Sequence, residues 1–94
     1  SRTFPIQNVH EHQVLFMQDF EDQGGIAFLL IYFSGENRYF YLPFSQLVDF
    51  WNRSRTGHAK SFHMEELDRN FEIKCHGYYL NYLPAIQADL NHRT

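Results

Sequence analysis

The sequence predicts a small α/β domain, and three features of the chain favour this fold class. Residues 10–23 have the apolar spacing of a helix, a run of eight apolar residues follows at 26–33, and an aromatic segment occupies 38–44. An uncharged run without polar alternation is typical of a strand buried on both faces, as in the middle of an α/β sheet. At 94 residues the chain has room for a single domain, 1–94.

The first expected element is a helix over residues 10–23. Apolar side chains recur there at spacings of three and four, which is the period of one helix face. The Gly24-Gly25 pair is predicted to end the helix, because glycine readily adopts the conformation found just beyond a helix C-terminus. Residues 1–9 are expected to form an irregular or extended lead-in.

The second expected element is a β-hairpin over residues 26–44. Residues 34–37, Ser-Gly-Glu-Asn, have the composition of a turn, and the aromatic-rich strand follows at 38–44. Pro43 lacks a backbone N–H, so it places this part of the strand at a sheet edge or at the strand's finish.

Shorter elements are expected in the second half of the chain. Ser45 has a side chain suited to cap a helix N-terminus, and Pro84 suits the first turn of another helix. The expected elements are a helix at 46–53, a basic loop at 53–60, a helix at 63–69, a strand at 71–75 and a closing helix at 84–92.

The expected sheet is incomplete. A strand buried on both faces needs a neighbour along each edge, yet the chain offers one firm neighbour at 38–44 and a weaker one at 71–75. The helix at 10–23 leads into strand 26–33 as in a strand-helix-strand unit whose first strand is missing. Three sources of that strand remain open: the lead-in at 1–9, a partner chain, or a preceding part of a larger domain.

Composition restricts the class of protein. No apolar run approaches the roughly 18 residues that a membrane helix needs, so we expect no membrane-spanning protein and no membrane partner. The single cysteine, Cys75, cannot form an internal disulfide, and the first residues lack the apolar core of a signal peptide. We therefore expect a reducing, cytoplasmic location.

The aromatic content is high for so short a chain, with ten Phe, six Tyr and one Trp. Aromatic faces such as that of Trp51 are surfaces on which nucleic-acid bases stack. Most aromatic residues at helix and strand spacing nevertheless belong to a hydrophobic core, which is the favoured interpretation for the group as a whole.

Charge argues against a general polyanion-binding domain. Eight Lys and Arg residues against eleven Asp and Glu give a net charge of −3, whereas nucleic-acid-binding domains usually carry a basic excess. The segment between Phe50 and Met64 nevertheless contains no acidic residue. Contact with DNA phosphates and a solvated charged loop both remain open there. Its basic residues are Arg53, Arg55 and Lys60, joined by His58 and His63.

The start of the first helix carries the sequence His10-Glu11-His12-Gln13. On a helix, His10 and Gln13 would share a face, whereas His10 and His12 would not. A helical zinc pair needs histidines four residues apart, so a polar and partly exposed first turn is the favoured interpretation.

A second candidate site is Glu72-Ile73-Lys74. In a strand, Glu72 and Lys74 would project from the same side. A metal-dependent nuclease uses such a pair, with the carboxylate holding the metal and the lysine stabilising charge. We favour the simpler interpretation of a surface ion pair on an edge strand.

Four segments, taken in order, resemble the RecU family of Holliday junction resolvases. The most specific is FPIQNVHEHQ at 4–13, followed by GGIAFLLIYFS at 24–34 and FYLPF at 40–44. The segment LNYLPAI at 80–86 is similar to the proline-and-tyrosine stretch that precedes the family's last helix. The resemblance covers nearly the whole chain.

The resemblance implies a homodimeric, Mg²⁺-dependent endonuclease that cuts four-way junction DNA during recombination and repair. It also implies a restriction-endonuclease-like core, with a mixed central sheet flanked by helices. Recombination proteins, such as a RecA-type recombinase or a branch-migration motor, would be further partners. The alternative is a truncated or inactive family member that acts as a dimerisation or protein-interaction module.

The resemblance also assigns roles to residues. Gln13 would help to bind the metal, with His10 and His12 nearby. The expectation that Arg53, Arg55 and Lys60 contact DNA comes instead from the charge of the basic segment. The catalytic acidic residues would lie upstream of Ser1, in an N-terminal hairpin that this chain lacks. Glu72-Ile73-Lys74 follows the first helix instead of preceding it, so it is not expected to be the catalytic motif. Mg²⁺ requires several hard oxygen ligands, which Gln13 alone does not supply.

Overall fold

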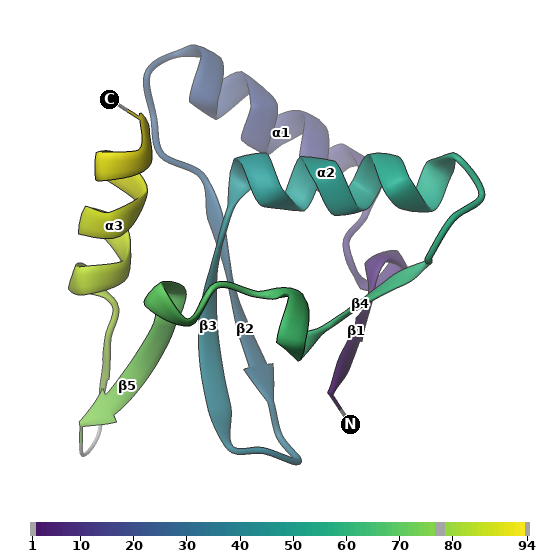
Figure 1. Ribbon diagram of the computed structural model, residues 1–94. Coiled ribbons are helices and arrows are strands. Elements are labelled where there is room, and N and C mark those ends of the chain that lie inside the picture. Colours follow the sequence, from purple (N-terminus) through teal and green to yellow (C-terminus); the bar gives the residue numbers. More distant parts are fainter. Residues whose placement is uncertain (1, 77–78, 94) are drawn as a thin grey trace.

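The computed structural model describes residues 2–76 and 79–93, which form three α-helices and two small antiparallel sheets (Figure 1). Three short 3-10 helices, η1 to η3, connect them. The elements in chain order are β1 (Thr3–Pro5), η1 (Ile6–Asn8), α1 (Glu11–Asp22), β2 (Phe28–Phe33), β3 (Arg38–Pro43), α2 (Phe44–Arg55), β4 (Ser61–His63), η2 (Met64–Glu66), η3 (Arg69–Phe71), β5 (Glu72–His76), β6 (Tyr79–Asn81) and α3 (Leu83–Arg93).

The larger sheet has the strand order β2-β3-β5-β6. Its β2–β3 pair is the predicted hairpin, with a register that runs from Phe28 opposite Pro43 to Phe33 opposite Arg38. Asn37 closes the turn with a positive φ of 51°, a conformation that asparagine tolerates well. The hairpin prediction is therefore confirmed.

The described strands pair only in the antiparallel sense, so these residues do not contain the expected mixed sheet. A parallel pair needs a crossover connection, usually a helix, between two strands of one sheet. Here α1 connects β1 to β2, and these two strands belong to different sheets. The lead-in strand β1 pairs instead with β4, from Thr3 opposite His63 to Pro5 opposite Ser61, so it does not supply the missing neighbour of β2.

Strand β2 is not buried on both faces, contrary to the sequence prediction. Ile31 and Phe33 are each only 3% exposed, whereas Leu30 and Tyr32 are 49% and 48% exposed. The strand lies at the edge of its sheet within the described residues, and α2 covers only one of its faces. The apolar run therefore has the period-two burial of a strand covered on one side.

Several element boundaries also differ from the predictions. Helix α2 begins at Phe44 with Pro43 as its N-cap, so Ser45 is not the capping residue. The helix continues to Arg55, which places Arg53 and Arg55 in its last turn instead of in a loop. The helix expected at 63–69 is two separate 3-10 turns, η2 and η3, and strands β4 and β6 were not predicted. The Cys75 side chain lies outside the described part of the structure.

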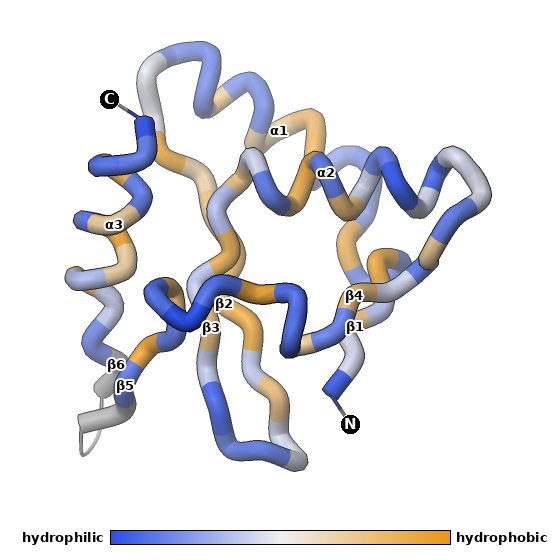
Figure 2. The backbone as a smooth tube through the Cα atoms, viewed as in Figure 1, coloured by the Kyte–Doolittle hydropathy of each residue, from blue (hydrophilic) through white to orange (hydrophobic). Residues whose placement is uncertain are grey.

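The core consists of two clusters on opposite sides of the sheet. The larger joins α1, α2 and the short β1–β4 pair, and it contains Leu42, Leu47 and Phe62 with no exposed surface. The smaller lies beneath α3 and contains Tyr41 and Ala85. Figure 2 shows residues of high hydropathy along β2, whereas β3 alternates between hydrophilic and hydrophobic residues. No helix exceeds 12 residues in the described chain, and none could span a bilayer.

A charged network attaches α3 to the rest of the domain. Asp89, only 3% exposed, accepts a hydrogen bond of 2.6 Å from the Tyr41 hydroxyl and one of 2.8 Å from the Arg93 guanidinium. Arg93 also contacts Glu21 at 2.7 Å, and Glu21 accepts a hydrogen bond from the Ala27 backbone N–H. We call the four side chains Glu21, Tyr41, Asp89 and Arg93 the α3 clip.

Candidate functional site

The side-chain carbonyl of Gln13 caps the N-terminus of α1. His10 precedes the helix in an extended conformation (φ −88°, ψ 151°), and its backbone N–H donates to Gln13 Oε1 at 2.9 Å. This contact satisfies one of the backbone donors that a helix N-terminus leaves without a partner. The oxygen expected to serve a metal ion is therefore already in a hydrogen bond, with its second lone pair available.

The rings of His10 and His12 lie face to face, contrary to the expectation from helical spacing. Their centroids are 5.6 Å apart and their planes differ by 4°. The helical-wheel argument fails because His10 is the N-cap residue, so only His12 follows helical geometry. Both side chains are exposed beside Gln13.

An apolar hollow of about 500 Å³ opens beside this helix N-terminus. Its lining residues are His12, Gln13, Phe16, Met17 and Leu29. Leu15, Phe16 and Phe20 are 60%, 71% and 48% exposed, and we call these three residues the α1 apolar patch. Several large apolar side chains exposed on one helix favour an interaction site.

The described residues do not fit Mg²⁺ by themselves. Among the side chains that the structure describes, no group of three from His, Cys, Asp or Glu is placed to hold a metal ion. Mg²⁺ prefers near-octahedral oxygen ligands, usually with at least one carboxylate. Gln13 supplies one amide oxygen, and the neighbouring imidazoles of His10 and His12 are nitrogen ligands.

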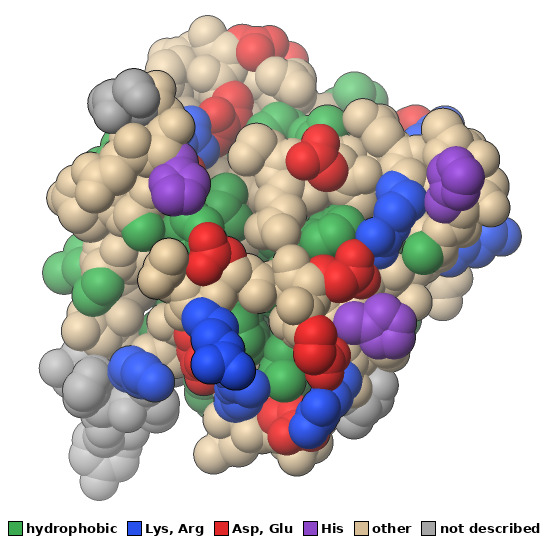
Figure 3. Space-filling model, viewed as in Figure 1, with side chains coloured by type: hydrophobic (Ala, Val, Ile, Leu, Met, Phe, Trp, Pro, Cys, Tyr) green, Lys and Arg blue, Asp and Glu red, His purple; other side chains and the backbone are tan. Residues whose placement is uncertain are grey.

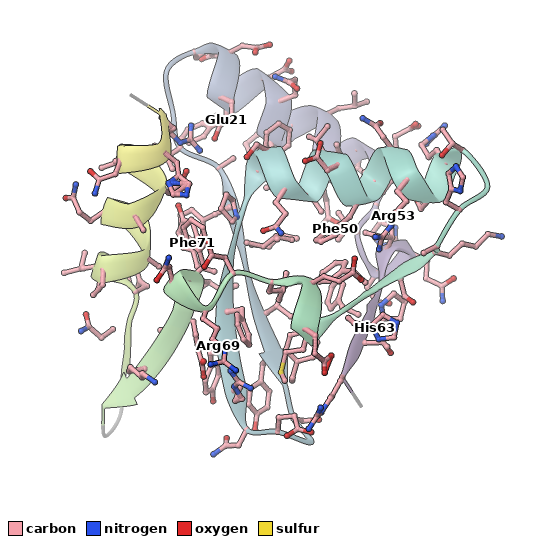
Figure 4. All side chains as sticks on the ribbon, viewed as in Figure 1. Glu21, Phe50, Arg53, His63, Arg69 and Phe71 are labelled. Atoms are coloured by element: carbon pink, nitrogen blue, oxygen red, sulfur yellow. The ribbon has the colours of Figure 1, made fainter. Side chains whose placement is uncertain are left out.

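The predicted DNA-contacting residues separate into two groups. Arg53 points from α2 towards β4 (Figure 4), where it donates to Glu66 at 2.7 Å and to the Ser61 carbonyl at 3.0 Å. Its guanidinium also lies 5.0 Å from the Phe50 ring centroid. The contact with Arg53 holds the pKa of Glu66 below its usual range. Arg53 therefore connects α2 to the segment that follows β4.

Arg55 and Lys60 lie together on a second hollow, of about 190 Å³. Arg55 contacts Glu11 at 3.0 Å, and both side chains of this pair are more than half exposed. The Arg55 guanidinium lies 5.7 Å from the ring centroid of Trp51. Figure 3 shows basic and histidine side chains at this end of α2 and in the loop that follows. We call this site the Trp51 hollow; its lining residues are Ile6, Gln7, Val9, Trp51, Ser54, Arg55 and Lys60.

Glu72 forms an ion pair, but with a different partner from the predicted Lys74. Arg38 on β3 donates to both carboxylate oxygens of Glu72, at 2.7 and 2.9 Å. The same contact lowers the pKa of Glu72. Strand β5 lies between β3 and β6, so the pair is within the sheet and not on an edge strand. Sequence reasoning missed both Arg38 and the role of Glu11, because these partners are 34 and 44 residues distant in sequence.

The fold and these sites define an α/β domain with an exposed apolar helix face and a separate basic, aromatic hollow. The family model described as RecU, recombination protein U, matches residues 1–88. The chain belongs to the RecU family.

Three relatives, each named Holliday junction resolvase RecU, illustrate the similarity. The chain is 41% identical over 86 residues to the protein of Staphylococcus carnosus, covering 89% of the chain and 41% of that protein. Identity is 36% over 88 residues with the protein of Bacillus pumilus, covering 92% and 42%. With that of Lactobacillus delbrueckii subsp. bulgaricus it is 41% over 73 residues, covering 77% and 35%. The chain thus spans about two fifths of the length of the relatives it matches.

Proposed function

We propose that the protein to which this chain contributes is a Holliday junction resolvase, an endonuclease that cuts four-way DNA junctions in recombination and repair. The observation that carries the proposal is the RecU family match over residues 1–88. We expect it to act on four-way junction DNA in the cytoplasm. Its partners would be junction DNA, a second copy of itself, and recombination proteins such as a RecA-type recombinase or a branch-migration motor.

The nuclease core would be restriction-endonuclease-like and would be completed by chain outside these residues. Strand β2 supports this, because it is an edge strand that exposes Leu30 and Tyr32 on its uncovered face. Exposed edges and apolar strand faces are normally covered in stable proteins. A strand from the rest of the protein would pair along β2 and bring catalytic carboxylates close to the N-terminus of α1.

Mg²⁺ would be the cofactor of the complete protein, and these carboxylates would supply the ligands that the described residues lack. The metal would assist water attack on the phosphodiester. Gln13 would contribute its amide oxygen through the lone pair left free by the His10 N–H. His10 and His12, stacked beside it, would lie close to the metal or to DNA without binding the ion.

The basic residues would bind the DNA backbone. Arg55 and Lys60 are the more accessible, because Arg55 has only an exposed partner in Glu11. Exposed ion pairs contribute little free energy, so a phosphate can replace Glu11 at small cost. Arg53 would act mainly by holding α2 against the following segment, since Glu66 and Ser61 already engage its guanidinium.

A second function is favoured by the α1 apolar patch. Its exposed Leu15, Phe16 and Phe20 suit a protein interface more directly than a nuclease site. A family member without cutting activity would use this surface for dimerisation or for binding a recombination partner. In an active resolvase the same patch would serve the homodimer.

The test is cleavage of a synthetic four-way junction in Mg²⁺ by the full-length protein that contains this chain, with a linear duplex as the substrate control. We expect Gln13→Ala to lower the cleavage rate at least tenfold, because it removes an oxygen beside the metal. Gln13→Glu is a second variant, because its carboxylate oxygen can still accept the hydrogen bond from the His10 N–H that caps the helix. Gln18→Ala is the matched control, since Gln18 is an exposed residue of the same helix whose side-chain amide donates to Asp22.

Two results would contradict this assignment. Full activity of Gln13→Ala would remove Gln13 from the metal site. Failure of the wild-type protein to cut the junction would leave the interaction module as the better account.

A further inference from the structure

The Trp51 hollow combines an apolar floor with a cationic rim. Ile6 and Val9 are 4% and 5% exposed and belong to the core, and Trp51 packs partly against the same core. Arg55 and Lys60 supply positive charge, and none of the lining residues is acidic. Lys60 forms no side-chain ion pair with any residue that the structure describes. This combination differs from a plain charged loop, because Trp51 lines the same hollow as the two cations and its ring centroid lies 5.7 Å from the Arg55 guanidinium.

Three hydrogen bonds to backbone carbonyls join the segments around the hollow. The Ile6 N–H donates to the Lys60 carbonyl at 3.0 Å, which connects η1 to the basic loop. The Ser54 hydroxyl donates to the Trp51 carbonyl at 2.7 Å within α2. Arg53 donates to the Ser61 carbonyl at 3.0 Å, immediately after Lys60. These bonds connect the backbone of η1 to the basic loop, and the loop to α2, before any ligand arrives, which lowers the ordering cost of binding.

We propose that the Trp51 hollow binds an unpaired nucleotide of single-stranded DNA, with its base against Trp51 and its phosphate on Arg55 and Lys60. Single-strand binding sites combine cations that follow the backbone with aromatic side chains on which bases stack. Duplex DNA does not fulfil the second requirement, because its bases are stacked on one another. The inference rests on the proposed function for the presence of junction DNA, at whose branch point bases can be unpaired.

Charge complementarity favours a nucleotide over an apolar peptide as the occupant. Two cations with one exposed carboxylate partner, Glu11, leave a local positive excess in a chain whose net charge is −3. A phosphate would replace Glu11 on Arg55 and draw the guanidinium away from its position 5.7 Å from the Trp51 ring centroid, where the base would then lie. Removing the Glu11 charge should therefore strengthen binding, whereas it would not affect an apolar peptide.

The experiment measures the affinity of this chain for a labelled single-stranded oligothymidylate and for a blunt duplex of equal length, by fluorescence anisotropy. The variants are Trp51→Leu, which keeps an apolar side chain without an aromatic face, and Trp51→Phe, which keeps the face. We expect Trp51→Leu to weaken single-strand binding roughly tenfold or more and Trp51→Phe by less than about threefold. Duplex affinity should change by less than about twofold in both.

Two further measurements do not depend on replacing Trp51. Trp51 is the single tryptophan of the chain, so its fluorescence reports directly on the hollow. We expect saturable quenching by the oligothymidylate in the unmodified chain. Glu11→Gln should tighten single-strand binding about two- to threefold.

Three results would each overturn the inference. The first is no quenching of Trp51 fluorescence at saturating oligothymidylate. The second is equal single-strand affinity of Trp51→Leu and Trp51→Phe, and the third is an equal loss of affinity for single-stranded and duplex DNA. Junction cleavage tests the proposed function separately. A protein that cuts junctions but shows no Trp51 dependence retains the function and loses the nucleotide site. A protein that binds single strands through Trp51 but does not cut retains the site and loses the function.

Discussion

The α3 clip and the Trp51 hollow both contain arginine paired with carboxylates, but in opposite surroundings. In the clip, Arg93 contacts Asp89 and Glu21, whose side chains are 5% and 16% exposed. In the hollow, Arg55 contacts Glu11, and these side chains are 57% and 62% exposed. A buried charge must keep its partners, whereas an exposed one exchanges them for water or ligand at little cost. The first arrangement serves stability, and the second leaves a cation available for binding.

The largest effect is expected from Asp89→Ala in the clip. The change leaves the Tyr41 hydroxyl and part of the Arg93 guanidinium without their acceptor in a buried site. We expect a loss of about 3 kcal/mol in the free energy of unfolding, measured by urea denaturation. The exposed Asp19→Ala on α1 is the control and should change stability by less than about 0.5 kcal/mol. Equal effects of the two changes would contradict the buried-network account.

Tyr41→Phe should have a smaller effect of the same kind. It removes the 2.6 Å hydrogen bond to Asp89 while the ring stays between Phe28 and Phe71. Burial and the neighbouring Asp89 raise the pKa of the Tyr41 hydroxyl, so the neutral donor is the form present at ordinary pH. We expect a loss of about 1–2 kcal/mol by urea denaturation. Tyr32→Phe, at an exposed hydroxyl that contacts Asn37, should be nearly neutral.

Acid should weaken the clip. The hydrogen bond from Arg93 holds the pKa of Glu21 below its ordinary value of 4.5. Because the pKa is lower in the folded chain, the stabilisation is fully present above about 4.5 and is lost as the pH falls through the folded value. In thermal melts between pH 6 and pH 3, the melting temperature of Glu21→Gln should fall less than that of the unmodified chain. Parallel curves for the two proteins would exclude this contribution.

The smallest effects on stability are expected around the Trp51 hollow, where Arg53 and Arg55 should differ. Arg53→Ala removes contacts to Glu66 and Ser61 and should cost about 1 kcal/mol. Arg55→Ala removes only an exposed pair and should cost less than about 0.5 kcal/mol. In DNA binding the order reverses, because Arg55→Ala should reduce the slope of log affinity against log salt by about 0.7–0.9. A larger slope change for Arg53→Ala would show that Arg53 leaves Glu66 to bind DNA.

Sequence reasoning predicted the elements whose signals are local. The hairpin at 26–44, the helix over 10–23 and the closing helix at 84–92 each appear, with ends displaced by one or two residues. Their periodicity and turn residues act within one element, so neighbouring residues suffice to predict them. The prediction of a helix at 63–69 was wrong, because η2 and η3 are single turns separated by extended residues. The residue pattern of this segment does not reveal that break.

The candidate site was predictable only in part. The family motif and the charge pattern made Gln13, Arg55 and Lys60 candidates, and their roles stay predictions, whereas the contact of Arg53 with Glu66 was not predicted. The Glu11–Arg55 and Arg38–Glu72 pairs join residues far apart in the sequence. Charge spacing predicts partners on one helix or strand, but no local pattern specifies which distant side chains meet.

The sequence by itself determined the family, the order of the main elements and the presence of a basic, aromatic segment after residue 50. The tertiary structure decided that β2 is exposed on one face, that Asp89 is buried in a charged network, and that Trp51, Arg55 and Lys60 border one hollow. The physical reason is that propensity and periodicity act over a few residues. Burial and partner choice depend instead on which surfaces meet when the whole chain packs.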